Sequence, residues 1–260
     1  MALLDHFGQP AVRQQLDTIL SGGRLPHAIL MYGEPGSGIL PGAISLANDI
    51  LCTSPQQGKA CRNCPSCNRA AKNIHPDLHF LLPLAGAKSL TEEYLGPWRE
   101  AISTNPWLDV FQWTQFCEVE GKQVDIHKED IQHVTADLSL QAFEGGNKVL
   151  VIWMAQFLAR EGNRLLKMIE EPPEQTYFIL VTNQREQVLP TIRSRCMQLY
   201  FPPMEQDEIL RLLVEEYKVD RNAAPLIARQ SVNNMGRAFS LAHNTMMNFK
   251  DEMASWFRAI

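Results

Sequence analysis

The stretch GEPGSGILPGAI, residues 33–44, has the glycine spacing of a phosphate-binding loop. It follows the apolar run AILMY at 28–32, which is typical of a strand buried on both faces. The segment 39–51 continues from the loop as an expected helix, and Pro41 is tolerated in its first turn. A strand, a glycine loop and a helix in this order are what a phosphate-binding loop requires. The stretch therefore predicts an α/β domain built around this loop.

The loop lacks the two side chains that hold nucleotide and metal. When the motif G-x-x-x-x-G-K-[ST] is laid on residues 33–40, Ile39 stands at the lysine position and Leu40 at the hydroxyl position. An aliphatic side chain can neither supply charge to a terminal phosphate nor bind magnesium. The glycines of this degenerate loop are Gly33, Gly36 and Gly38. Their spacing alone is equally typical of a tight turn, so both interpretations stay open.

Length and composition describe a globular protein large enough for one sizeable domain and a smaller one. The chain has 260 residues, of which 45% are hydrophobic and 20% are charged. Its net charge of −5 argues against a protein that is basic throughout, so any contact with nucleic acid is local or shared with partners. No apolar run approaches the roughly 20 residues of a membrane helix, and the N-terminus lacks the pattern of a signal peptide. We therefore expect a cytoplasmic protein.

Two further apolar runs predict neighbouring strands of a parallel sheet, VLVIW at 149–153 and YFILVT at 177–182. Between them we expect a helix at Gly162–Glu171, closed by the two prolines that follow it. Another helix is expected at Pro10–Leu20. The segment 84–123 has no readable pattern and is expected to elaborate the same domain. This alternation predicts an α/β fold, doubly wound around a parallel sheet.

The strand patterns stop after PheProPro at 201–203. Three helical patterns follow, at Glu205–Tyr217, Asn222–Gln230 and Met235–His243. We therefore expect a first domain over 1–202 and a small all-helical domain over 203–245.

Four of the six cysteines form the pattern C-x8-C-x2-C-x2-C, within a module at 52–67. The ligand candidates are Cys52, Cys61, Cys64 and Cys67. Two-residue spacings let thiolates converge on one ion, and four sulfurs make a closed tetrahedral site, so the pattern favours structural zinc over a catalytic metal. An iron–sulfur cluster is disfavoured because the x3-C-P continuation is missing, and four free thiols are the other alternative. We interpret His75 as a turn residue before Pro76 rather than as a ligand.

Several segments together resemble the bacterial DNA polymerase III clamp-loader subunits of the AAA+ family. They are PHAILMYGEPGSG (26–38), CTSPQQGKACRNCPSC (52–67), NKVLVIWMAQFLAREGNRLLKMIEEPPEQTYFILVT (147–182) and LPTIRSRC (189–196). The resemblance extends from about Gly8 to His243. It implies an AAA+ domain with a zinc-binding insertion, followed by a helical lid domain. The chain resembles the subunit type without a working ATP site more closely than the ATP-hydrolysing gamma/tau type.

The resemblance also shows how far the ATP site has departed from the family pattern. Trp153 and Met154 stand where an active member carries the acidic pair that holds magnesium. Gly236 occupies the position of the second sensor arginine, although a shift by one residue would place Arg237 there. Thr182 matches the first sensor position, but we interpret it as an ordinary strand-end threonine. We therefore expect neither ATP binding nor intrinsic ATPase activity.

In this family the arginine of SRC reaches across a subunit boundary to the nucleotide of the neighbour. That residue is Arg195, which the resemblance implies to be an arginine finger acting in trans. Outside this motif, an arginine near a strand is more often part of a surface ion pair. We interpret Arg193 as a local structural arginine, and Glu170 and Glu171 as a helix end rather than as an acid/base pair.

Two principal functions follow from these observations. The first is a non-catalytic, stator-like clamp-loader subunit that works with gamma/tau and delta subunits, the sliding clamp and primed DNA. The alternative is an active AAA+ ATPase whose motifs are misaligned, but no lysine lies between Arg24 and Lys59. A freestanding zinc-dependent nucleic-acid binder is disfavoured because few basic residues surround the cysteines. Family members carry a helical collar after the lid, so we interpret 246–260 as the start of a truncated or missing collar.

Overall fold

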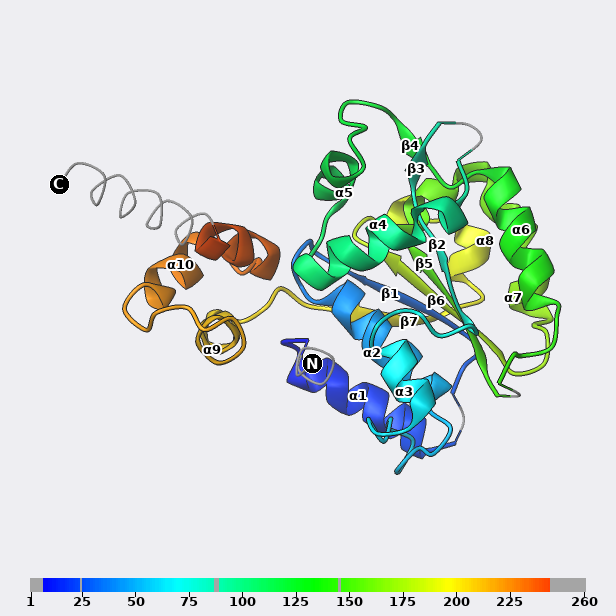
Figure 1. Ribbon diagram of the computed structural model, residues 1–260, viewed down its shortest axis with the longest axis horizontal. Helices are drawn as coiled ribbons and strands as arrows, with labels where there is room; N and C mark the ends of the chain where they lie inside the picture. The colour runs from blue at the N-terminus through cyan, green and yellow to red at the C-terminus, as the bar shows by residue number, and fades with distance from the viewer. Residues whose placement is uncertain (1–6, 24, 87–88, 145, 244–260) are drawn as a thin grey trace.

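The fold is organised by one five-stranded sheet in the order β2-β5-β6-β1-β7, in which every neighbouring pair is parallel. The computed structural model describes residues 7–23, 25–86, 89–144 and 146–243 (Figure 1). The strands are β1 Ala28–Gly33, β2 Leu78–Leu81, β5 Lys148–Trp153, β6 Thr176–Thr182 and β7 Met197–Phe201. The predicted α/β class with a parallel sheet is confirmed.

The three strands that the sequence predicts, β1, β5 and β6, are the centre of this sheet. Their carboxyl ends are level, because Tyr32 pairs with Thr182 and Trp153 pairs with Val181. The edge strands β2 and β7 were not predicted. The strand β7 alternates between buried and exposed residues, so it lacks the continuous apolar run that marks a strand covered on both faces.

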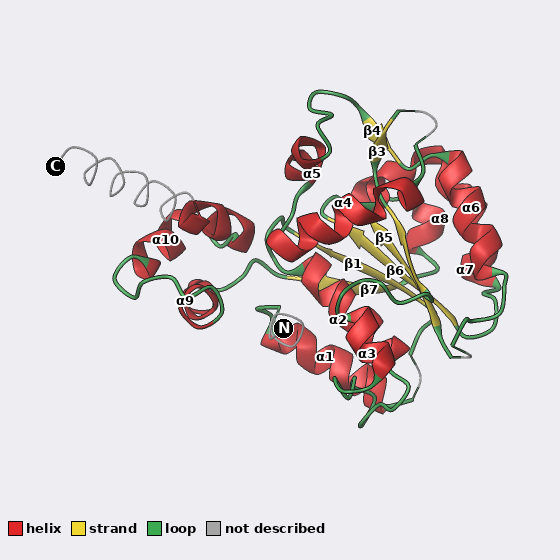
Figure 2. Cartoon of the chain, viewed as in Figure 1, coloured by secondary structure: helices red, strands yellow, loops and turns green. Residues whose placement is uncertain are grey.

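Helices cover both faces of the sheet, as Figure 2 shows. One face packs on α1 Pro10–Ser21, α2 Ile39–Leu51, α4 Thr91–Thr104 and α5 Val110–Phe116. The other face packs on α6 Lys128–Leu138, the 3₁₀ helix η2 Ala155–Leu165, α7 Leu166–Glu170 and α8 Pro190–Arg193. Strand residues alternate between the two cores, with Ile29 and Met31 in the first and Leu30 in the second. The short 3₁₀ turn η3 spans Arg185–Gln187.

The helix expected at Gly162–Glu171 is only partly correct. Its end is right, because α7 stops at Glu170. Its start is wrong, because the chain follows the 3₁₀ helix η2 as far as Leu165, and Ala159 interrupts that helix with φ 42° and ψ −134°. Buried Leu158 and Leu165 tie this segment to the second core. Tertiary packing therefore decides a backbone path that the sequence pattern does not specify.

The segment 84–123 forms α4, α5 and the strand β3 Leu84–Ala85, which pairs antiparallel with β4 Val124–Asp125 just after it. Two of its tryptophans reach the end of β5. The ring centroid of Trp153 lies 4.9 Å from the ring centroid of Trp98 and 6.3 Å from that of Trp113. Trp98 and Trp113 also contact each other edge to face, at 5.5 Å. The segment is thus part of the first core rather than a surface addition.

The remaining helices have a hydrophobic core of their own. They are α9 Gln206–Glu215, α10 Ala224–Gln230 and a helix at residues 235–243. We call these three helices together the helical cluster. All three helical patterns of the sequence are present. Trp107, from the segment before α5, is buried in this core, and its indole N–H donates to the hydroxyl of Tyr217 at 2.5 Å. The expected collar at 246–260 lies outside the described residues.

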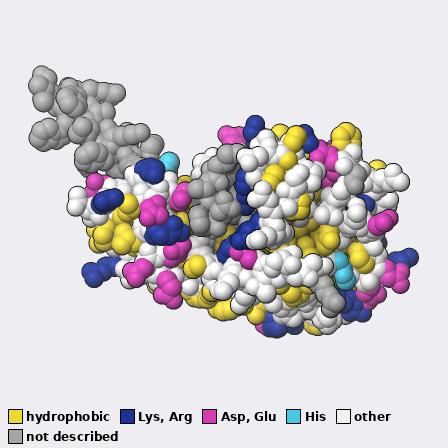
Figure 3. All heavy atoms as spheres, turned by 90° about the horizontal axis from the view of Figure 1, so that it is seen from below, with side chains coloured by type: hydrophobic (Ala, Val, Ile, Leu, Met, Phe, Trp, Pro, Cys, Tyr) yellow, Lys and Arg dark blue, Asp and Glu magenta, His cyan; other side chains and the backbone are white. Residues whose placement is uncertain are grey.

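On the face shown in Figure 3, basic and acidic side chains are interspersed, with hydrophobic side chains between them. Among the described residues, no helix is both long and apolar enough to cross a membrane.

Candidate functional site

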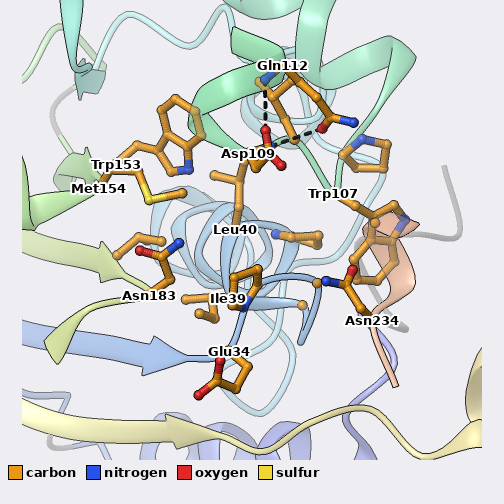
Figure 4. Close-up of a pocket in the computed structure, with 18 of the residues that line it drawn as sticks. Glu34, Ile39, Leu40, Trp107, Asp109, Gln112, Trp153, Met154, Asn183 and Asn234 are labelled. Atoms are coloured by element: carbon orange, nitrogen blue, oxygen red, sulfur yellow. Dashed lines mark hydrogen bonds between the residues drawn. The ribbon is translucent and has the colours of Figure 1, made fainter. Parts of the chain in front are cut away.

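The glycine loop lies at the carboxyl edge of the sheet and opens into a small cavity (Figure 4). The cavity measures about 220 Å³. Its walls come from the loop, the ends of β5 and β6, the segment before α5 and the helical cluster. Pockets for small ligands usually measure roughly 300–1,000 Å³, so this one is small for a nucleotide.

The two residues that replace the lysine and the hydroxyl are core residues. Ile39 is 7% exposed and Leu40 is 5% exposed, and both belong to the first core. Every residue of α2 is buried, and most of them are apolar. The start of this helix is therefore fixed by its neighbours, without a ligand.

The position of the missing acidic pair is also filled by packing. Trp153 is fully buried between Trp98 and Trp113, and its side chain reaches the cavity beside Met154 (Figure 4). A buried indole offers a single N–H donor and no oxygen ligand for a metal. The end of β5 therefore has no side chain that can bind magnesium.

The two sensor positions also line the cavity. The Thr182 hydroxyl donates to the side-chain oxygen of Gln156 at 2.6 Å and accepts from the backbone N–H of Gln184 at 3.0 Å. This supports the interpretation of Thr182 as a strand-end residue that is satisfied within the fold. Gly236 and Arg237 both border the cavity. The second sensor position therefore lies at the cavity whether it is assigned to Gly236 or, after a shift by one residue, to Arg237.

The charges around the cavity do not favour a phosphate. Glu34 in the loop and Asp109 at the start of α5 place carboxylates at its walls. Arg237 is the only basic residue among the described residues that line it. A nucleotide carries several negative charges, which two carboxylates repel.

The helical cluster contacts the glycine loop directly, which the sequence did not indicate. The backbone N–H of Met235 donates to the carbonyl of Gly36 at 3.2 Å. Gly36 has φ +77°, and a Cβ built there would lie 2.1 Å from the side-chain oxygen of Asn234. Glycine is therefore required by a protein contact, not only by a phosphate. The glycine spacing contains no sign of this contact, because its partner lies about 200 residues later in the chain.

The cysteine module brings its four thiols together, with all sulfur atoms within 4.8 Å of one another. The Sγ atoms of Cys52 and Cys64 are 4.0 Å apart, and those of Cys61 and Cys67 are 3.9 Å apart. Zinc–sulfur bonds of about 2.3 Å in a tetrahedron give sulfur–sulfur edges of about 3.8 Å. The cluster therefore has the size of a four-thiolate site and could hold a metal ion. All four cysteines are free of disulfides.

Backbone N–H groups support this cluster. Cys61 donates to the Sγ of Cys52 at 3.2 Å, and Cys67, in α3 Pro65–Ala70, donates to the Sγ of Cys64 at 3.4 Å. Such bonds stabilise thiolates and orient them toward a metal. His75 is engaged elsewhere, because its Nε2 lies 2.9 Å from the Ser66 hydroxyl. It does not belong to the four-residue cluster.

A buried carboxylate attaches the cysteine module to the first two helices. Asp49 of α2 accepts from the backbone N–H of Ala60 at 2.9 Å and pairs with Arg13 of α1 at 3.0 Å. Burial raises the pKa of Asp49, and the positive charge of Arg13 opposes this shift. The carboxylate therefore joins α1, α2 and the module at a single point.

Arg195 lies on the other side of the sheet, just after α8. Its side chain is 38% exposed and forms an ion pair with Glu170, the last residue of α7. The ion pair that the sequence left as the alternative is thus present, and the finger role stays a prediction. Arg193 pairs with Glu186 at 2.6 Å, in agreement with a local structural role. Cys196 is buried, and this burial raises the pKa of its thiol to about 12.

The chain matches one known protein family over most of its length. A family model described as "DNA polymerase III, delta subunit" matches residues 8–205. The chain belongs to this family. Its relatives include the DNA polymerase III subunit delta' of Bacillus subtilis, with 30% identity over 91% of this chain and 60% of the relative. The delta' subunit of Escherichia coli is 29% identical over 88% of this chain and 58% of the relative.

A second kind of subunit is also similar. The DNA polymerase III subunit gamma/tau of Mycobacterium bovis is 25% identical over 97% of this chain and 38% of that protein. The match spans about 60% of the length of the Bacillus subtilis and Escherichia coli delta' subunits. The resemblance to the AAA+ clamp-loader subunits of DNA polymerase III that the sequence indicates is confirmed at the level of the family, and it points to the delta' type.

Contact with the helical cluster makes Gly36 sensitive to a single added methyl group. Gly36→Ala should lower the free energy of unfolding by about 1–3 kcal/mol more than Gly121→Ala, because it adds a steric clash to the same backbone strain. Gly121 is the matched control, since it has φ +74° and no atom within 4 Å of its Cβ position. Urea unfolding measures the difference, and hydrogen exchange at the Met235 amide should accelerate only in Gly36→Ala. If both variants lost the same free energy of unfolding, the contact between Gly36 and the helical cluster would be contradicted.

Proposed function

We propose that this chain is the non-catalytic delta' subunit of a DNA polymerase III clamp loader. In this role it holds an ATPase neighbour in place and helps to load the sliding clamp onto primed DNA. Its partners are gamma/tau and delta subunits, and its place is the cytoplasm, where bacterial DNA is replicated. The observation that carries the proposal is the apolar packing of Ile39 and Leu40 at the two positions where an ATPase holds phosphate and magnesium.

The energetics of the site support the absence of hydrolysis. A charge-assisted contact to phosphate or metal contributes roughly 1.5–3 kcal/mol, and the lysine, the magnesium ligand and the acidic pair are all replaced. No single substitution reverses this, because Trp153 is fully buried in an aromatic cluster. The alternative of an active AAA+ ATPase draws on the likeness to a gamma/tau subunit. It would require other residues to provide these contacts, and Arg237 is the only described basic residue at the cavity.

The four thiols suit structural zinc. The sulfur spacing fits a closed tetrahedral site, and a closed site leaves no open position for catalysis. Zinc would join Cys52 at the end of α2 to the loop that carries Cys61 and Cys64. Its contribution is to fix this loop against the first two helices.

Arg195 suits a role at a subunit boundary because its side chain is 38% exposed and does not line the chain's own cavity. It follows α8, which packs on the face of the sheet opposite to α2. A guanidinium that reaches the terminal phosphate of a neighbour stabilises charge that develops in the transition state. A subunit without an ATPase of its own can then control hydrolysis in the assembly.

The proposal predicts that the isolated chain neither binds nor hydrolyses ATP. Calorimetry should find no binding at micromolar ATP. Ile39→Lys should not restore turnover, because Leu40 and Trp153 still leave magnesium without ligands. It should also destabilise the fold, since position 39 is buried. Measurable turnover in Ile39→Lys would favour the active ATPase instead.

Purified protein should contain about one zinc ion per chain, held by four thiolates. Cys64→Ser should lower the zinc content toward zero and lower the melting temperature, while the large α/β core still folds. Cys117→Ser is the control and should retain the metal, because Cys117 lies outside the cluster. Elemental analysis that finds iron, or no metal, would overturn the assignment.

Arg195→Ala should reduce DNA-stimulated ATP turnover and clamp loading in a complex reconstituted with gamma/tau and delta subunits. An arginine finger contributes roughly 10³–10⁵ in turnover at a single site, and several ATPase subunits dilute the loss for the whole complex. Arg195→Lys should rescue only in part, because an ammonium lacks the bidentate geometry.

Arg164→Ala is the matched control, because Arg164 is also exposed and also paired with a carboxylate, that of Glu161. It should leave turnover unchanged. Zinc content and assembly should be the same in all these variants. An Arg195→Ala complex that works at the unmodified rate would rule out the finger.

A further inference from the structure

The guanidinium of Arg195 is held in one orientation before any partner binds. Its Nε–H donates to Oε1 of Glu170, and its Nη1 donates to the backbone carbonyl of Thr191 at 2.9 Å. The Ser194 hydroxyl lies 3.5 Å from the same Nη1. Two sides of the planar group are therefore fixed, one by a carboxylate and one by the main chain of α8.

These contacts leave one nitrogen available. A guanidinium has five N–H donors in a fixed fork, so binding through Nε and Nη1 leaves the two N–H bonds of Nη2. Among the described residues, none accepts a hydrogen bond from Nη2. The side chain is 38% exposed, so an oxygen anion from another molecule can approach it.

Glu170 is well placed to hold this orientation. It is the last residue of α7, and two prolines follow after Glu171, which fixes where the helix ends. The carbonyl end of a helix also attracts a positive charge. The carboxylate is 44% exposed, so its ion pair with Arg195 adds little to stability. An exposed pair that stabilises little and leaves one nitrogen of the arginine free fits a role in orientation.

We propose that Glu170 is a positioning residue for the arginine finger: it holds Arg195 so that Nη2 faces the phosphate held by the neighbouring subunit. This inference rests on the proposed function. Arginine loses many rotamers when it is fixed, and a contact that fixes it in advance removes that penalty from the catalytic step. Glu170 itself does not touch the nucleotide, and its effect passes entirely through Arg195.

The test uses the same reconstituted complex, with turnover measured over a range of ATP concentrations on primed DNA. Glu170→Ala should lower kcat by about two- to tenfold, with KM for ATP unchanged. This factor corresponds to the entropy cost of ordering one long side chain, that of Arg195, during the catalytic step. Glu170→Gln keeps an oxygen acceptor and should lie between Glu170→Ala and the unmodified chain. Glu171→Ala is the matched control, because Glu171 is the exposed neighbour in the same helix end, and it should have no effect.

The double variant separates a positioning role from a structural one. In a chain that already carries Arg195→Ala, adding Glu170→Ala should change nothing further. An equal loss in both backgrounds would assign Glu170 a structural role, and unchanged or faster turnover in Glu170→Ala alone would also overturn the inference. If Arg195→Ala slows the complex and Glu170→Ala does not, the finger stands and the positioning role fails. If Arg195→Ala has no effect, the finger role on which this inference rests fails, and the positioning role fails with it.

Discussion

The packing at the carboxyl end of the central strands is the constraint on which the rest of the structure depends. Trp153 ends β5 inside a cluster with Trp98 and Trp113, and α2 begins beside it with two buried aliphatic residues. In a nucleotide-binding protein this place is polar and partly filled by the ligand. Here the side chains fill it themselves, so the strand, the loop and the helix keep their arrangement without nucleotide.

This packing gives the glycine loop a different task. Its Gly36 accepts a hydrogen bond from Met235 and lies against Asn234, so the loop is a contact surface for the helical cluster. Trp107 adds a second link, because it comes from the segment before α5 and is buried in the core of the helical cluster. Together these two contacts join the α/β domain to the helical cluster.

The thiol cluster and the ion pair of Arg195 with Glu170 both lie apart from this packing. The thiol cluster lies beyond α2, on the side of the sheet that also packs on α1, while Arg195 and Glu170 lie at the ends of two short helices on the other side. A change at either place can therefore leave the sheet intact.

The sequence by itself determined the central strands, the glycine loop without a lysine, the spacing of the cysteine module and the three helices between residues 205 and 243. These features are local, because they depend on runs of apolar residues or on short fixed spacings. The tertiary structure alone decided the edge strands, the 3₁₀ path of η2 and the burial of Trp98 and Trp113 against Trp153. It alone also decided the contact of Gly36 with Asn234 and the pairing of Glu170 with Arg195 across 25 residues. Each of these joins distant segments, and a pattern read along the chain contains no distances in space.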